Sequence, residues 1–146
     1  MDVGPIELTF ETRAAPELAW AFLTEPDRVA EWFSEVLPLG EVGDPYRIDF
    51  GEGSVVEGRI LAIEPGRGFA HDWAWLEAGR VPEPPTRVTW SIEALPDGGS
   101  RVTLRHEGWA AAGADDAIRD DHEAYWSGYL DDLHDLLEEA IAGTTD

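Results

Sequence analysis

A single apolar stripe runs through the C-terminal part of the sequence. Apolar and aromatic residues recur there at spacings of three and four, which is the period of one face of an α-helix. The series is Ile118, His122, Tyr125, Trp126, Tyr129, Leu130, Leu133, Leu137 and Ile141. Asp115 or Asp116 is suited to cap this helix, and Gly143 is suited to end it. The helix should be about 40 Å long at 1.5 Å per residue, and its apolar face has to pack against another element.

Upstream of this helix, short segments alternate apolar and polar residues, which is typical of half-buried strands. They are IELTFET at 6–12, YRIDF at 46–50, VVEGRILAI at 55–63, FAHDWAWLEA at 69–78, RVTWSIEAL at 87–95 and RVTLRHEGW at 101–109. The turn sequences GEGS, EPGRG and PDGG separate several of them. VPEPP at 81–85 is unsuited to a central strand, because proline donates no ladder hydrogen bond. Since each strand has one apolar face, we expect an antiparallel sheet with one face in water.

Two short helices are expected after the first strand. Pro16 and Glu17 suit a helix start, and the sequence TEP at 24–26 opens a second short helix that ends near Phe33. The predicted fold is therefore α+β, with a curved antiparallel sheet wrapped around the long C-terminal helix and the helical pair closing one end. A curved sheet cannot contact a straight helix everywhere, so large side chains fill the gap or a cavity remains. We expect one domain over residues 1–146.

The net charge of -21 reflects 31 Asp and Glu residues against ten Arg, with no Lys. This charge repels phosphate backbones and anionic membrane surfaces, so we expect no binding to nucleic acid or to membranes. Asn and Gln are also absent. Two explanations are open: a GC-rich genome, which encodes Arg in place of Lys and avoids Asn codons, or adaptation to high salt, where ions screen the self-repulsion. We favour the first.

Several classes of protein are excluded by missing features. The chain has no cysteine, which rules out disulfides, thiolate metal sites and cysteine nucleophiles. It has no apolar run of about 18 residues and no signal peptide in MDVGPIELTF, so we expect a cytoplasmic location. There is no GxSxG, Walker-type or GxGxxG motif, and we expect no cofactor. The four histidines lack HxH or HExxH spacing, and we expect no metal.

Three stretches together resemble a known family. They are APELAWAFLTEPDRVAEWF at 15–33, EGRILAIEPGRGFAHDW at 57–73, and RVTLRHEGW at 101–109 followed by HEAYWSGYLDDLHDLL at 122–137. The chain resembles the START-like (SRPBCC, helix-grip) superfamily, and within it the proteins similar to the C-terminal domain of the heat-shock protein 90 ATPase activator. It departs from that pattern at His71, where an aromatic residue is common, at Tyr125, where Gly is usual, and in the insert at 74–85.

The resemblance implies the helix-grip fold but does not choose a function. Such proteins include lipid and hormone carriers, polyketide aromatase/cyclases, antibiotic-sequestering proteins and a co-chaperone domain. Our leading hypothesis is a non-catalytic protein that binds a small apolar or aromatic molecule in a cavity between sheet and helix. One alternative is a polyketide cyclase or dehydratase; another is a chaperone-interacting module. We expect a monomer or weak homodimer.

The candidate ligand-binding residues combine large rings with a few polar groups. The walls would come from Trp20, Trp32, Phe50, Trp73, Trp90 and Trp126, and the polar part of the ligand would be oriented by His71, His106 and Tyr125. His122 joins these histidines and Tyr125 as an acid-base candidate if the protein is an enzyme. The opposing interpretation is that the rings are ordinary core and that each histidine is hydrogen-bonded to backbone or to a tyrosine.

Overall fold

The structure is a computed structural model, and it describes residues 4–51, 53–75, 85–110 and 116–143. In chain order the elements are β1 (Ile6–Thr12), α1 (Pro16–Thr24), α2 (Pro26–Trp32), β2 (Glu35–Val36), β3 (Pro45–Asp49), β4 (Val55–Glu64), β5 (Gly68–Trp75), β6 (Thr86–Ala94), β7 (Ser100–Glu107) and α3 (Asp116–Gly143). The expectations given above for residues 76–84 and for Asp115 concern residues outside those that the structure describes.

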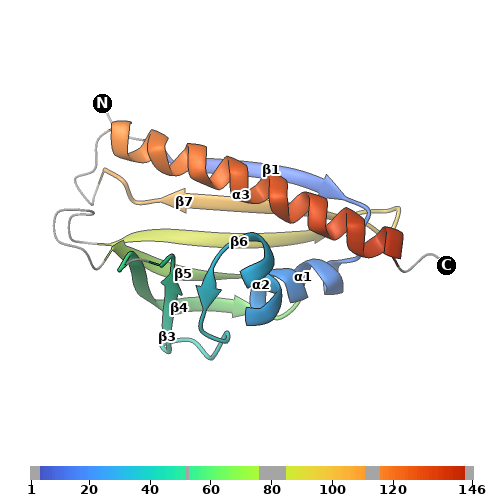
Figure 1. The fold of residues 1–146 in the computed structure, drawn as a ribbon, viewed down its shortest axis with the longest axis horizontal. Helices are drawn as coiled ribbons and strands as arrows, with labels where there is room; N and C mark the ends of the chain where they lie inside the picture. Colours follow the sequence, from blue (N-terminus) through green and yellow to red (C-terminus); the bar gives the residue numbers. More distant parts are fainter. Residues whose placement is uncertain (1–3, 52, 76–84, 111–115, 144–146) are drawn as a thin grey trace.

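The strands form one antiparallel sheet in the order β1-β7-β6-β5-β4-β3-β2. Figure 1 shows α3 lying lengthwise along the sheet, where it contacts β1. Helix α1 contacts β6, β7 and α3, while α2 contacts β2 and α3. The predicted α+β, helix-grip architecture is therefore confirmed, including the two short helices after the first strand.

The boundaries differ from the sequence expectations by one or two residues. Pro45 begins β3, Thr86 begins β6 and Ser100 begins β7, each just before the start of the alternating pattern. The two-residue strand β2 was not anticipated, because it is too short to show alternation and exists only through its pairing with β3.

The two faces of the sheet separate as the alternation predicted. On one face, Val88, Leu104 and Trp90 are buried. On the other, polar pairs cross between strands: Thr9 with Thr103, Arg101 with Glu11 and Glu93, and Arg105 with Glu7. These exposed pairs give the outer face a cross-strand ladder, in which each contact is weakened by solvent and salt.

The β4–β5 ladder contains a register shift of the kind that a β-bulge produces. The pairing of β4 with β5 shifts register between Ile60 and Ala62, and a bulge of this kind bends a strand and increases its twist. Close by, a Cβ added to Gly58 would lie 2.1 Å from the Asp72 carbonyl oxygen, so the two strands approach here more closely than a side chain permits.

Helix α3 buries four residues of the predicted stripe. Trp126, Leu130, Leu133 and Leu137 are buried against the sheet. The expectation that Tyr125 faces the sheet was wrong, because 72% of its surface is exposed. It lies one residue before Trp126, about 100° around the helix, and the indole of Trp126 occupies the centre of the buried face.

Candidate ligand-binding site

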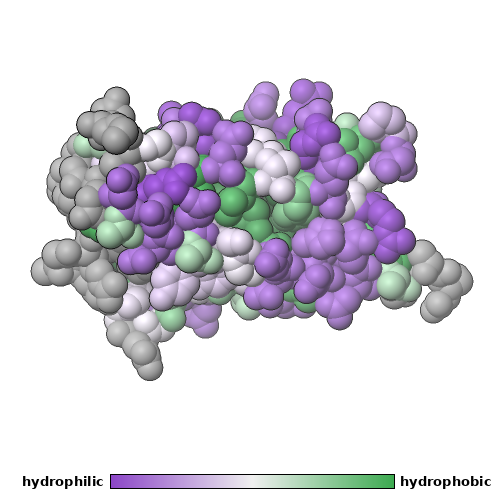
Figure 2. Space-filling view, turned by 90° about the horizontal axis from the view of Figure 1, so that it is seen from above, coloured by the Kyte–Doolittle hydropathy of each residue, from purple (hydrophilic) through white to green (hydrophobic). Residues whose placement is uncertain are grey.

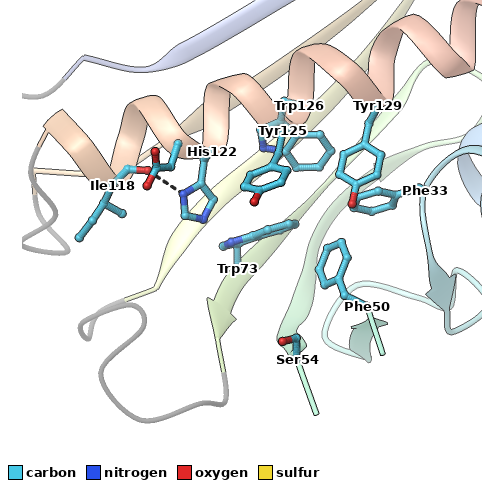
Figure 3. A pocket seen from close by; sticks show the side chains of 10 residues that line it. Phe33, Phe50, Ser54, Trp73, Ile118, His122, Tyr125, Trp126 and Tyr129 are labelled. Atoms are coloured by element: carbon cyan, nitrogen blue, oxygen red, sulfur yellow. Dashed lines mark hydrogen bonds between the residues drawn. The ribbon is translucent and has the colours of Figure 1, made fainter. Parts of the chain in front are cut away.

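A pocket of about 430 Å³ opens between the first half of α3 and the part of the sheet that contains the β3–β4 hairpin and β5 (Figure 3). It is lined by Phe33, Phe50, Ser54, Trp73, Ile118, Asp121, His122, Tyr125, Trp126 and Tyr129. These residues come from the end of α2, the β3–β4 hairpin, β5 and α3. The pocket lies at the N-terminal half of the helix, between the two elements for which a cavity was predicted. That it is a ligand-binding cavity stays a prediction.

Ring contacts hold the floor and one wall of the pocket. Phe33 stacks on Trp126 with ring centroids 5.2 Å apart, and it meets Phe50 and Tyr129 edge-on at 5.4 and 4.8 Å. Trp73 lies 5.3 Å from Trp126. Edge-to-face and offset arrangements of this kind are the favourable ones for aromatic pairs. The rings therefore support one another and shape the pocket before any ligand arrives.

Helix α3 supplies six of the lining residues because of its period. Ile118, Asp121, His122, Tyr125, Trp126 and Tyr129 are separated by one, three or four residues. That spacing places them on one face over three turns. In Figure 3 Tyr125 and Tyr129 extend from the helix toward Trp73 and Phe33.

His122 is the histidine that borders the pocket. Its Nδ1 donates a hydrogen bond to the Ile118 carbonyl oxygen at 2.8 Å, which fixes the ring against the helix (Figure 3). Desolvation lowers the pKa of His122, although this backbone contact and the nearby Asp121 carboxylate act in the opposite direction. The imidazole is therefore neutral near pH 7.

His106 is fully buried behind the pocket wall and its hydrogen bonds fix its tautomer. Trp126 Nε1 donates to His106 Nδ1 at 3.0 Å, and an indole can only donate. The ring hydrogen of His106 is therefore on Nε2, which donates to Thr86 Oγ1 at 2.8 Å, while Thr86 donates to the Trp73 carbonyl oxygen at 3.3 Å. Burial lowers the pKa of His106 well below its usual value. This histidine positions Trp126.

His71 is also buried, and it lies among rings of the sheet. Its Nδ1 donates to the Asp72 carbonyl oxygen at 2.8 Å, and its ring centroid is 4.6 Å from that of Tyr46. Burial lowers the pKa of His71 to about 4. The interpretation of His71 as a core residue predicted a backbone hydrogen bond of this kind.

Four of the nine sequence candidates line the pocket and five lie elsewhere. Phe50, Trp73, Tyr125 and Trp126 line it. The residues that do not are Trp20, Trp32, His71, Trp90 and His106. Three of these stand directly behind the wall: Trp32 stacks on Phe33 at 5.2 Å, Trp90 meets Trp126 at 5.7 Å, and His106 hydrogen-bonds Trp126. Whether any of the nine contacts a ligand stays a prediction.

Sequence reasoning did not name Phe33, Ser54, Ile118, Asp121 or Tyr129 as site residues. The α3 members could have been found, because they share the face of His122 and Tyr125 at spacings of three and four. Phe33 and Ser54 follow from tertiary structure alone, since they lie at the ends of elements where no period applies.

Other site types are not visible in the described part of the chain. Within residues 4–51, 53–75, 85–110 and 116–143, no group of three or more His, Cys, Asp or Glu side chains is arranged to hold a metal ion. None of the described helices is both long and apolar enough to cross a lipid bilayer.

Comparisons with known proteins agree on the fold. A family model described as "Activator of Hsp90 ATPase homolog 1-like protein" matches residues 13–138. The solved structure of protein MLL2253 from Mesorhizobium loti is similar with a TM-score of 0.81 and 21% identity, covering 97% of this chain and 98% of that one. The Aha1 dimer from Colwellia psychrerythraea is similar with a TM-score of 0.75 and 20% identity, covering 93% and 97%.

DynU16, described as a putative protein in the dynemicin biosynthetic locus, is also similar, with a TM-score of 0.80 and 22% identity. The similarity covers 94% of this chain and 48% of DynU16, so the chain spans about half of that protein's length. No curated protein matches the sequence. At these identities the solved structures establish a shared fold and leave the ligand open.

Proposed function

The chain belongs to the family of Activator of Hsp90 ATPase homolog 1-like proteins, and from this premise we propose that it binds a small, largely apolar or aromatic molecule between sheet and α3. The observation that carries the proposal is the ring-lined pocket of about 430 Å³. Small-molecule sites are commonly clefts of about 300–1,000 Å³ with mostly apolar walls and a few polar groups. Ser54, Asp121, His122 and the two tyrosine hydroxyls would be those polar groups.

The support behind the wall favours binding over simple core packing. Trp126 is held by a hydrogen bond to His106 and by contacts with Trp90 and Phe33. A ring fixed in this way loses little freedom when a ligand arrives, which lowers the entropic cost of binding. A purely structural core would instead close over the available space, since protein interiors are packed as densely as organic crystals.

A binding experiment with two matched helix variants tests the proposal. Titration of a panel of aromatic compounds should quench or shift the tryptophan fluorescence, because Trp73 and Trp126 line the pocket. Tyr129→Ala should weaken binding of any hit about tenfold, as expected for losing a ring contact of about 1.4 kcal/mol. Leu136→Ala, a half-buried position on the same helix outside the pocket, should leave affinity unchanged. If no compound binds, or if both variants lose affinity equally, the proposal fails.

A cyclase or dehydratase is the second candidate, and one observation favours it. The neutral imidazole of His122 borders the pocket beside the phenol of Tyr125, and such groups act as general acids or bases near pH 7. The enzyme hypothesis now depends on His122, since His71 and His106 are buried away from the pocket. Under it, His122→Gln should abolish turnover of a bound compound and leave its affinity intact.

Further proposals concern the whole chain. A chaperone-interacting role, which the family's name suggests, would be supported if this protein stimulated a purified Hsp90 ATPase. We also propose a single domain over residues 1–146, a cytoplasmic location, and a monomer or weak homodimer. The description of the Colwellia protein as a dimer makes sedimentation over a range of concentrations the appropriate measurement.

A further inference from the structure

The pocket wall combines aromatic faces with a carboxylate. Six of its ten lining residues are Phe, Tyr or Trp, and one is Asp121. The face of an aromatic ring carries negative electrostatic potential and attracts cations within about 6 Å of its centroid. No arginine is among these lining residues, and the sequence contains no lysine. Burial lowers the pKa of His122, so its imidazole adds no positive charge near pH 7.

Asp121 keeps its charge available at the pocket. Arg119, two residues earlier on α3, ion-pairs instead with Asp120 and Glu123. Within the described part of the chain, Asp121 takes part in no salt bridge. It is exposed and lies one helical turn before Tyr125, so its carboxylate and the two tyrosine rings follow one another along one face.

The net charge of the whole molecule has the same sign as the Asp121 carboxylate. The net charge is -21, and a protein of one dominant sign attracts oppositely charged solutes and repels those of like sign. An anionic ligand would have to approach this field and then lie beside Asp121. A neutral apolar ligand would need the rings but would leave the carboxylate without a role.

We propose that the pocket accepts an organic cation, in which an ammonium or quaternary ammonium group is attached to an apolar or aromatic body. The charged group lies between the Asp121 carboxylate and the faces of Tyr125 and Tyr129, and the body contacts Phe33, Phe50 and Trp73. This inference rests on the proposed binding function of the same pocket and adds the chemical class of the ligand.

Three dansyl probes with a common linker test the charge directly. Their end groups are trimethylammonium, the neutral and nearly isosteric tert-butyl group, and carboxylate. At about 0.15 M salt, where the Debye length is about 8 Å, long-range attraction to the surface is largely screened. We expect the trimethylammonium probe to bind about tenfold more tightly than the tert-butyl probe, within the range of cation–π and ion-pair contributions. The hydrophobic effect alone predicts the opposite order.

Paired variants locate the effect in the pocket. Asp121→Asn and Tyr125→Leu should each weaken the cationic probe about threefold more than they weaken the tert-butyl probe. Both positions are exposed, so the fold should tolerate the changes. Asp135→Asn removes the same charge from an exposed site about 21 Å further along α3 and should have no effect.

The outcomes separate the two proposals. Equal binding of the cationic and neutral probes, or stronger binding of the carboxylate probe, would overturn the cation inference and leave the binding function standing. An equal loss in Asp121→Asn and Asp135→Asn would reduce the preference to net charge and would also overturn it. If neither these probes nor any compound of the aromatic panel binds, the binding function itself fails and the inference falls with it.

Discussion

His71 on β5 and His106 on β7 lie on the inner face of the sheet on either side of Val88, yet their ring nitrogens have different partners. The His106 ring accepts a hydrogen bond from Trp126 and donates one to Thr86, whereas His71 donates to the backbone of the next residue. From the sequence both were candidates for orienting a ligand, because alternation gives only the face on which a side chain lies. The partners of His106 come from β6 and α3, and burial, which lowers the pKa of both histidines, keeps both rings neutral near pH 7.

Burial of His71 predicts a loss of stability in mild acid. The folded-state pKa is about 4 and the unfolded value is 6.5, so between these values the unfolded chain binds a proton that the folded protein excludes. Stability from this group is complete above pH 6.5 and falls as the pH drops toward 4, by about 1.4 kcal/mol per pH unit. His71→Phe, which keeps a ring of similar shape, should reduce the slope by that amount in urea unfolding measured from pH 8 to pH 4.

The slope is the decisive measurement for His71→Phe. The buried His106 and the half-buried His122 shift in the same direction, so the variant retains part of the wild-type dependence. Stability at pH 8, where all three rings are neutral in both states, serves as the reference for packing changes. An unchanged slope in the variant would show that His71 is accessible to protons in the folded protein.

At the scale of elements, the far end of α3 is joined to β1 by a carboxylate. Glu138 Oε2 accepts hydrogen bonds from Thr12 Oγ1 at 2.6 Å and from the Arg13 backbone N–H at 3.0 Å. Its Oε1 accepts from Arg13 Nε at 2.8 Å. These contacts lower the pKa of Glu138 to about 2. The Glu138 side chain thus connects the edge strand β1 to α3, the helix around which the sheet is wrapped.

Glu138→Gln should weaken this junction in a pH-dependent manner. The loss of charge-assisted hydrogen bonds should lower the unfolding free energy by about 1–2 kcal/mol at pH 7. Because the folded pKa is depressed, the stabilisation is complete above the unfolded value of 4.5 and is lost as the pH falls toward 2. The difference between variant and wild type, measured by denaturant unfolding, should therefore vanish near pH 2.

The adjacent Glu139 provides the control for that experiment. It is exposed on the same helical turn, and Glu139→Gln removes an identical charge without touching Thr12 or Arg13. Equal destabilisation by the two substitutions would mean that the effect comes from the charge of α3 as a whole. The junction described here would then contribute nothing measurable.

For the whole molecule, the acidic composition appears as a hydrophilic surface. Figure 2 shows hydrophilic side chains surrounding a smaller hydrophobic area on the face seen from above. Ten arginines cannot neutralise 31 carboxylates, even where they form cross-strand pairs such as Arg101 with Glu11. Charges of one sign held on a compact surface repel one another, and this repulsion opposes folding.

Added salt should therefore raise the melting temperature. Raising the ionic strength from about 0.1 M to 1 M shortens the Debye length from about 10 Å to about 3 Å and screens the repulsion. We expect an increase of about 5 °C, equivalent to roughly 1–2 kcal/mol in a domain of this size. Calorimetry in NaCl and in KCl should give the same increase, since screening depends on ionic strength. A melting temperature that stays constant or falls would contradict this expectation.

The local pattern of the sequence was sufficient for the elements and their arrangement. Alternation in segments such as IELTFET and the spacing from Ile118 to Ile141 are properties of neighbouring residues, and they determined the strands, the long helix and the helix-grip fold. They also determined which faces are buried. Tyr125 is the exception, because it lies 100° around the helix from Trp126 and therefore at the edge of the stripe.

Only the tertiary structure decided which of the many aromatic residues surround empty space. Phe33, Phe50 and Trp73 come from three separate segments of the chain and meet α3 because the bent sheet diverges from a straight helix at that end. Trp32 and Trp90 are aromatic residues of the same type as Trp73. They nevertheless lie one layer further in, where they pack behind the pocket wall. The identity of a wall residue depends on the distance between elements far apart in the chain, and no local period encodes that distance.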